Sequence, residues 1–407
     1  QMFLLMLSYV LQLLCVHGSL AQFYLANGTF QKHFLSIAED LAENQLRPQA
    51  DNVDETGQFP KENFDAFSST GLLGLRIPKH HGGMGADVLS AVMVIERLSR
   101  ACGSTGMCFK MHCESTEPIW RLAKDEQVNR FVKPIAAGER ITTTAIAEAG
   151  TGSHTWSLQS SITPFEDGYE LSNVRKGWVT SSEYADLYFT PAMLDKALPG
   201  HFTSFVLEKE NVEWSIDGEW NGLGMRANAS SPMTFSGIIP KDNRLGGESA
   251  WPAEVMPVFM PFSMVTFAAV YLGIAEGAFA ICVDHLTGRA YGDTGSKLAE
   301  IDGIQRYVGE MRIALDRTRA LLYAVCSLIE DNDVADPAPF IECVCAADET
   351  ALFVTRTAMN VGGGRSYGGD NALGRYLRDA QAGSVMAPTD DIIKLRVGRL
   401  QLGQPQF

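Results

Sequence analysis

The residues best placed to do chemistry gather in a few short segments. Two adjacent carboxylates, Asp390 and Asp391, follow the segment RDAQAGSVMAPT (378–389), and a carboxylate can act as a general base. The pair also has a structural explanation, in which Thr389 caps a helix and both acids favour its first turn. The glycine-rich segments are GGMGAD (82–87), AEAGTGSH (147–154) and GGGRSYGG (362–369). They allow close backbone approach to a ligand, but singly they are weak signals.

Composition limits the function classes. The chain has 407 residues, which suggests two or three domains, and its 46% hydrophobic and 20% charged residues are typical of a soluble globular protein. A net charge of -15 repels phosphate backbones, so we expect no nucleic-acid partner. The eight cysteines form no CxxC pair. We therefore predict reduced, mostly buried thiols in an intracellular protein, with no metal site and no disulfides.

Residues 1–28 form an apolar N-terminal extension. The run FLLMLSYVLQLLCV (3–16) has the length of a signal-peptide core and is too short for a confident membrane span. No Lys or Arg precedes Lys32, so the basic region of a signal peptide is missing. We interpret the run as an upstream extension and expect a cytoplasmic protein. The alternative is a membrane-associated or exported protein, if the run is a functional signal.

The elements that must position these segments change type twice along the chain. Residues 29–141 show helical periods, above all at 88–101 and 106–123. Residues 142–245 alternate β-branched and aromatic runs, beginning with TTTAIAEAG (142–150), with turns, including a predicted hairpin at 165–171. Residues 246–407 return to helices, with an apolar helix at 260–290 that we expect to be buried. Further helices are expected at about 301–329 and 337–361, then a break at 362–369 and a last helix near Pro388.

This order predicts an α+β fold and excludes a doubly wound nucleotide-binding sheet. With its motifs collinear over residues 29–403, the chain resembles the acyl-CoA dehydrogenase family of flavoproteins. The resemblance implies an N-terminal helical domain, a central antiparallel β-barrel-like domain and a C-terminal four-helix bundle. It implies FAD as cofactor and an acyl-CoA or acyl-carrier thioester as substrate. It also implies electron-transfer flavoprotein or oxygen as acceptor, and a homo-oligomer, a dimer or a tetramer.

The resemblance assigns one set of flavin contacts to the middle of the chain. TTAIAEAGTGSH (143–154) resembles the family's TEPGAGSD turn, which brings the backbone around Ile146 and Ala147, with Gly152 and Ser153, to the flavin. Ala147 stands where the family has a flavin-touching Thr, so that side-chain contact is not expected.

The segment RKGWVTSS (175–182) resembles the family strand whose aromatic residue stacks beside the flavin and whose Thr meets its N5 edge. Trp178 and Thr180 match these roles. Taken alone, a Trp here would more commonly be a core residue of the sheet.

A second set of cofactor contacts is implied for the C-terminal helices. Arg289 matches the family Arg that reaches the flavin pyrophosphate of a neighbouring subunit, and Gln305 matches a cofactor-contacting Gln. Gly363 and Gly364 match a loop on the adenosine half of the dinucleotide. Thr389 matches the family Thr that follows the base position, and it is counted among the cofactor-binding residues.

The family's catalytic base is missing. In most members a Glu follows RDA at a fixed distance and removes the α-proton of the thioester, and here that position is Ala387. The second family position for a base, on the long buried helix, is Ser263. Three interpretations stay open. Asp390 is a relocated base, no α-proton is removed, or the protein binds flavin without turnover. The family-default activity is α,β-dehydrogenation of an acyl thioester. The alternative is a flavin monooxygenase or another non-dehydrogenating member, such as a desulfinase.

Overall fold

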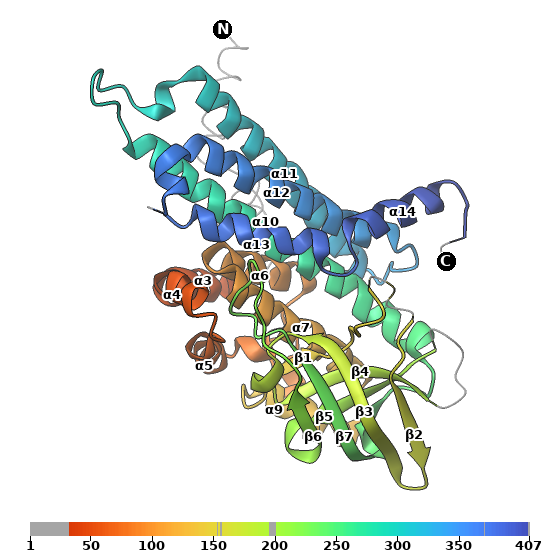
Figure 1. Ribbon diagram of the computed structural model, residues 1–407. Coiled ribbons are helices and arrows are strands. Elements are labelled where there is room, and N and C mark those ends of the chain that lie inside the picture. The colour runs from red at the N-terminus through yellow and green to blue at the C-terminus, as the bar shows by residue number, and fades with distance from the viewer. Residues whose placement is uncertain (1–31, 153, 155–156, 195–200, 370, 406–407) are drawn as a thin grey trace.

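The computed structural model describes residues 32–405 except 153, 155–156, 195–200 and 370. The extension 1–28 and the predicted flavin contact Ser153 lie outside the described residues. Figure 1 shows a group of N-terminal helices, a twisted sheet beside them and a long bundle of C-terminal helices above both. The predicted order of helices, then strands, then helices is confirmed.

The N-terminal part is helical. The longer helices are α3 (Lys32–Leu41), α4 (Arg47–Thr56), α5 (Lys61–Thr70), α6 (Val88–Ala101) and α7 (Gly103–Leu122), followed by the short α8 (Asp125–Gln127) and α9 (Lys133–Ala136). Helix α6 begins where Asp87 accepts a hydrogen bond from the Ser90 amide, at 2.6 Å. Helix α7 is almost wholly buried, because it runs between the sheet and the C-terminal helices.

The middle part is an eight-stranded, mostly antiparallel sheet with the order β6-β7-β3-β2-β4-β5-β8 and with β1 paired to β4. Its strands are β1 (Thr142–Thr144), β2 (Ser161–Phe165), β3 (Gly168–Val179), β4 (Leu187–Leu194), β5 (Thr203–Glu208), β6 (Glu213–Ile216), β7 (Ser231–Pro240) and β8 (Arg244–Leu245). The pairs β1–β4 and β2–β4 are parallel. The hairpin predicted at 165–171 is confirmed as the β2–β3 turn. The strand expected over 142–150 was wrong beyond Thr144, where the glycine-rich segment forms a loop.

The C-terminal part contains the long helices α10 (Met256–Gly288), α11 (Asp302–Glu330) and α12 (Ala338–Tyr367), with α13 (Leu373–Val385) and α14 (Asp390–Gln401). The expected break at 362–369 was partly wrong. Helix α12 continues to Tyr367 and bends at Gly363, whose φ of 62° and ψ of -154° are not helical. The sequence analysis also missed α13, although Leu373, Tyr376 and Ala380 recur in it at helical spacing and are buried.

The core ties the N-terminal and C-terminal helices together. One apolar cluster runs through α6, α7, α10, α11, α12 and α13. Helix α10 belongs to a stretch, Trp251–Gly288, that is apolar and long enough to cross a membrane, but 83% of its most apolar window is buried inside the protein. The prediction of a buried central helix is therefore confirmed. The seven cysteines of the described chain are free and buried, as predicted.

Candidate functional site

The glycine-rich loop at 145–152 is held on the sheet by a buried ion pair. Lys176 of β3 donates a hydrogen bond from Nζ to Glu148 Oε1 at 2.8 Å, and the Gln159 amide donates to Glu148 Oε2 at 2.6 Å. The carbonyl of Ala147 accepts a hydrogen bond from the Gly177 amide at 2.7 Å. These contacts fix the loop beside the end of β3, next to Trp178.

This edge of the sheet fits a flat ring. The side chain of Trp178 is 57% exposed, which argues against a core role for it, and its ring meets the edge of Trp220 at a centroid distance of 5.8 Å. A Cβ added at Gly150 or Gly152 would meet nothing within 4 Å, so the space in front of the loop is open. An exposed indole beside an open glycine turn is the arrangement that a planar cofactor needs.

Thr180 lies at the inner edge of the same surface. Its hydroxyl is 2.9 Å from that of Ser230, and its carbonyl accepts a hydrogen bond from Thr143 Oγ1 at 2.7 Å. Thr143 belongs to β1, so Thr180 is tied directly to the strand that leads into the glycine loop. Ile146, Ala147 and Gly152 therefore belong to a loop that is bonded beside the end of β3, which carries Trp178 and leads into Thr180.

The other predicted cofactor residues lie on the C-terminal helices. Gln305, Gly363 and Gly364 are exposed, and Arg289 is partly exposed at the end of α10. Gln305 donates a hydrogen bond to the Ala299 carbonyl at 2.9 Å. A Cβ at Gly363 or Gly364 would meet no atom within 4 Å. Their exposure leaves them available to a ligand or to a neighbouring chain.

The segment that carries the family base position approaches a buried carboxyl. Thr389 immediately precedes α14, but its side chain makes no capping bond, and Asp390 lies in the first turn. The Asp390 side chain is only 13% exposed, and it lies beside Asp348 of α12. Burial, followed by the hydrogen bond with Asp390, raises the pKa of Asp348 to about 8. Asp390 is thus part of a carboxyl pair rather than a freely solvated first-turn acid.

A second buried carboxylate lies deeper, where α7, α10 and β1 meet. Ser263 of α10 donates a hydrogen bond from Oγ to Glu114 Oε2 at 2.5 Å, and Thr144 of β1 donates to Glu114 Oε1 at 3.2 Å. Lys110, one helical turn before Glu114, forms an ion pair with it. Glu114 is 3% exposed and Lys110 is fully buried. The sequence analysis missed this cluster. A Lys and a Glu four positions apart in a helix otherwise rich in small and apolar residues were the available signal.

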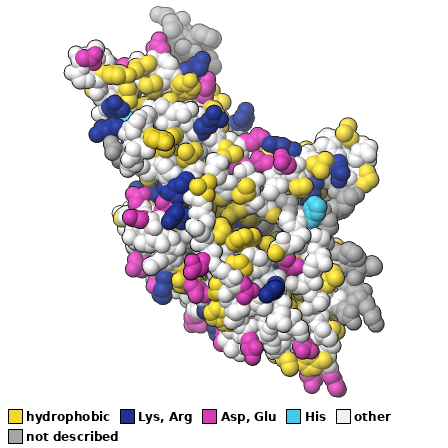
Figure 2. Space-filling model, in the orientation of Figure 1, with side chains coloured by type: hydrophobic (Ala, Val, Ile, Leu, Met, Phe, Trp, Pro, Cys, Tyr) yellow, Lys and Arg dark blue, Asp and Glu magenta, His cyan; other side chains and the backbone are white. Residues whose placement is uncertain are grey.

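Aromatic side chains on α10 connect Glu114 with the carboxyl pair of Asp348 and Asp390. Phe267 lies under the Lys110 ammonium, with Nζ 3.1 Å from the ring centroid, and stacks on Tyr271 at 6.2 Å. Tyr271 donates its hydroxyl to the sulfur of Met386 at 3.6 Å, and Met386 directly precedes Ala387. Burial, then the charges of Asp348, Asp390 and Glu114, raises the pKa of Tyr271. One region is therefore bordered by Tyr271, by Ala387 and by the carboxyl groups of Glu114, Asp348 and Asp390. Figure 2 shows apolar side chains around a hollow where the sheet meets the C-terminal helices.

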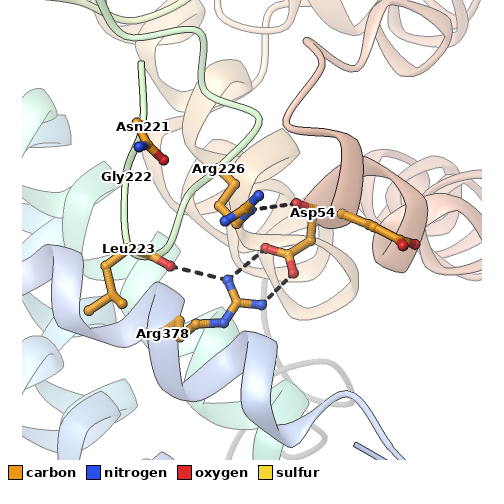
Figure 3. A pocket seen from close by; sticks show the side chains of 7 residues that line it. Asp54, Asn221, Gly222, Leu223, Arg226 and Arg378 are labelled. Carbon is orange, nitrogen blue, oxygen red and sulfur yellow. Dashed lines mark hydrogen bonds and ion pairs between the residues drawn. The ribbon is translucent and has the colours of Figure 1, made fainter. Parts of the chain in front are cut away.

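A separate open pocket lies at the meeting point of α4, the loop before β7 and α13 (Figure 3). Arg378 donates from Nη1 to Asp54 Oδ1 at 3.0 Å and to the Leu223 carbonyl at 3.1 Å, and Arg226 donates to the Asp54 carbonyl at 2.8 Å. Next to Arg378, buried Asp379 accepts the Met225 amide at 2.7 Å. Arg378 is thus bound to both α4 and the loop before β7, so the RDA segment holds α13 against the sheet domain.

Comparisons with known proteins agree with this arrangement. Family models described as the N-terminal, middle and C-terminal domains of acyl-CoA dehydrogenase match residues 29–139, 143–238 and 265–390. The short-chain specific acyl-CoA dehydrogenase of Clostridium acetobutylicum is 29% identical over 368 residues, which are 88% of this chain and 94% of that protein.

Two solved structures share the fold. The butyryl-CoA dehydrogenase of Megasphaera elsdenii superposes with a TM-score of 0.86 at 24% identity, over 92% of this chain and 99% of its own. The prolyl acyl carrier protein oxidase AnaB superposes with a TM-score of 0.84 at 22% identity, over 92% of this chain and 99% of its own. With the glycine loop, Trp178 and Thr180 on one surface and with matches from residue 29 to residue 390, the chain belongs to the acyl-CoA dehydrogenase family.

Proposed function

We propose that this protein is an FAD-dependent oxidoreductase that removes the α- and β-hydrogens of an acyl thioester. The observation that carries the proposal is the surface formed by the open glycine loop, the exposed Trp178 and Thr180, in a chain that matches all three domains of the family. Bound FAD supplies the acceptor for the hydride that leaves the β-carbon.

The chain's own residues have three tasks in this reaction. Trp178, which is exposed, and the open loop at 145–152 would hold the flat ring, and Thr180 would lie at its edge. Arg289 supplies a guanidinium, which pairs well with a pyrophosphate, and its place at the end of α10 suits a cofactor shared with a neighbouring subunit of a homo-oligomer. The third task is to accept the α-proton, and Ala387 cannot perform it.

The experiment is to mix the purified protein with acyl-CoA esters of increasing length in the absence of oxygen and to follow flavin absorbance. Bleaching of the flavin by one of these esters supports the proposal. Readmitting oxygen or adding electron-transfer flavoprotein to the reduced protein then identifies the acceptor. A colourless protein that takes up no FAD contradicts the cofactor assignment.

A second candidate function is favoured by Ala387. A flavin monooxygenase, or another non-dehydrogenating member such as a desulfinase, needs no carboxylate at the family position. In that case acyl-CoA esters leave the flavin oxidised, and a separate reductant is needed before oxygen is consumed. A protein that binds FAD and shows neither reaction would be a flavin-binding protein without turnover.

A further inference from the structure

Hydrogen bonds and packing connect the cluster of Glu114, Ser263, Thr144 and Lys110 with both the flavin surface and the vacant base position. Glu114 accepts a hydrogen bond from Thr144, and the preceding residue, Thr143, donates to the carbonyl of Thr180. Ser263 of α10 also donates to Glu114, and the same helix carries Phe267 and Tyr271, whose hydroxyl contacts Met386, next to Ala387. The carboxylate is therefore connected to one part of the site through β1 and to the other part through α10.

The carboxylate of Glu114 also lies close to Ser263, which stands at the position that carries the catalytic base in some family members. Here the Ser263 hydroxyl oxygen lies one bond from its Cβ, and Glu114 Oε2 lies 2.5 Å beyond that oxygen. A Glu side chain at position 263 would carry its carboxylate oxygens a comparable distance from Cβ. Glu114 delivers a carboxylate to that place from α7 instead of from α10.

The surroundings keep Glu114 in one orientation. Lys110 provides a positive charge on the same helix, and the hydroxyls of Ser263 and Thr144 each donate to a different oxygen. Burial lowers the pKa of Lys110 to about 8, while Glu114 acts in the opposite direction and supports the charged form. A buried ion pair of this kind contributes little to stability compared with an apolar pair. Stability alone therefore does not explain why Glu114 and Lys110 are charged residues.

We propose that Glu114 is the proton acceptor of this protein, relocated from the position of Ala387 to helix α7, with Lys110 as its positioning residue. The proposal rests on the proposed dehydrogenation. The α C–H bond of the thioester breaks, and its proton goes to a Glu114 oxygen. The electron pair of that bond becomes the second bond between Cα and Cβ, as the β-hydrogen leaves with its own pair for the cofactor.

The test compares Glu114→Gln with Glu117→Gln. Glu117 lies on the same helix, is equally buried and pairs with Arg76 at 2.9 Å, so it is a control for the loss of a buried charge. Three quantities are measured for each variant: FAD content per chain, the dissociation constant of an acyl-CoA ester by calorimetry, and the anaerobic rate of flavin reduction per bound flavin. For Glu114→Gln we expect FAD content and ligand affinity within about twofold of the wild type and a rate lower by about 10²–10⁴-fold.

Two further variants keep a carboxylate in the cluster. Glu114→Asp retains a partner for Lys110 but withdraws the oxygens by one methylene, so we expect a folded protein with a reduced rate. Exchanging the two residues, Glu114→Ser with Ser263→Glu, returns a carboxylate to the same place from α10. This exchange should recover at least about tenfold of the rate lost in Glu114→Gln. A folded exchange variant that stays as slow as Glu114→Gln contradicts the proposal.

The outcomes separate the two proposals. If the wild type is reduced by an acyl-CoA ester and Glu114→Gln is reduced equally fast, Glu114 is not the acceptor and the dehydrogenase assignment stands. The same conclusion follows if Asp348→Asn or Asp390→Asn abolishes reduction while Glu114→Gln does not. If Glu114→Gln loses FAD content and ligand affinity but keeps its rate per bound flavin, the residue is structural. If no acyl-CoA ester reduces the wild type, the proposed function fails, and the base assignment fails with it.

Discussion

At the scale of single residues, the site is held by buried charges that are paired across the sheet. Burial alone would raise the pKa of Glu148, but Lys176 and the Gln159 amide outweigh it, so the pKa of Glu148 lies below its ordinary value. Lys176 is fully buried and donates a second hydrogen bond to the Pro191 carbonyl at 2.9 Å. Removing the charge of Glu148 therefore leaves an ammonium without its counter-charge in the sheet.

Glu148→Gln should lower the free energy of unfolding by about 3–5 kcal/mol, because a buried pair is broken by removing one partner. It should also loosen the glycine loop, so FAD is lost more readily on dialysis. Urea unfolding and the ratio of flavin to protein absorbance measure the two effects. Glu43→Gln breaks the exposed pair with Arg47 and is the control, with an expected change within about 1 kcal/mol. Equal effects of the two variants would refute the anchoring role of Glu148.

Asp348 should make stability fall as the pH rises. Its pKa is about 8 in the folded protein, mainly through burial and then through Asp390, whereas an unfolded Asp titrates near ~3.9. Between these values the unfolded chain has lost a proton that the folded chain keeps, so stability decreases by about 1.4 kcal/mol per pH unit. The charged neighbours are Glu349 on α12 and Asp390 and Lys394 on α14.

Asp348→Asn should flatten this dependence, because an amide does not titrate. Urea midpoints at several pH values between about 5 and 8 provide the measurement. Asp65→Asn, at an exposed residue paired with Lys61, is the control and should leave the slope unchanged. Parallel curves for Asp348→Asn and the wild type would show that Asp348 is ionised throughout.

At the scale of elements, α13 and α12 pack so closely that a glycine is required between them. A Cβ at Gly383 would lie 1.9 Å from Asp348 Oδ1 and 3.1 Å from Asp348 Cβ, so the clash cannot be relieved by turning the tip of the side chain. At Gly374, in the same helix, an added Cβ meets no atom within 4 Å. Substitutions at the two glycines therefore distinguish the effect of packing on stability from the effect of helix propensity.

Gly383→Ala should destabilise the protein by about 1–3 kcal/mol through overpacking, although Ala is the better helix former. Gly374→Ala should instead stabilise it by up to about 1 kcal/mol. Thermal unfolding of both variants measures the difference. A stabilised Gly383→Ala variant would mean that α12 and α13 separate easily.

The elements also show what the sequence could and could not predict. Helix α6 was predicted from its strong apolar period, and α10 was predicted from its long, nearly continuous run of apolar residues. Trp178 and Thr180 could be assigned from the resemblance of one short segment. The cluster of Glu114 and Ser263 could not, because these residues are 149 positions apart and meet only when α7 packs on α10. The Asp348–Asp390 pair was hidden in the same way, since it needs α12 and α14 side by side.

At the scale of the whole molecule, the C-terminal helices expose apolar side chains along with the residues expected to bind a neighbour's cofactor. Ile313 and Tyr307 of α11 are 68% and 41% exposed, and Tyr367 at the end of α12 is 86% exposed. Figure 2 shows exposed apolar side chains among charged ones on the upper helices. Tyr367 lies four residues after Gly363 in α12, and exposed apolar surface on a helical bundle is typical of a subunit interface.

We therefore expect assembly and cofactor retention to fail together. Ile313→Glu places a charge on the exposed face of α11 and should shift the protein towards monomers in light scattering, with loss of FAD. Arg289→Ala should weaken FAD retention and loosen the assembly together, because it removes a contact between one chain and the cofactor of its neighbour. Leu223→Glu, at a residue 67% exposed on the sheet side, is the matched control and should change neither property. A wild type that is monomeric in light scattering and still retains FAD would show that each chain completes its own cofactor site, and Arg289 would then need another role.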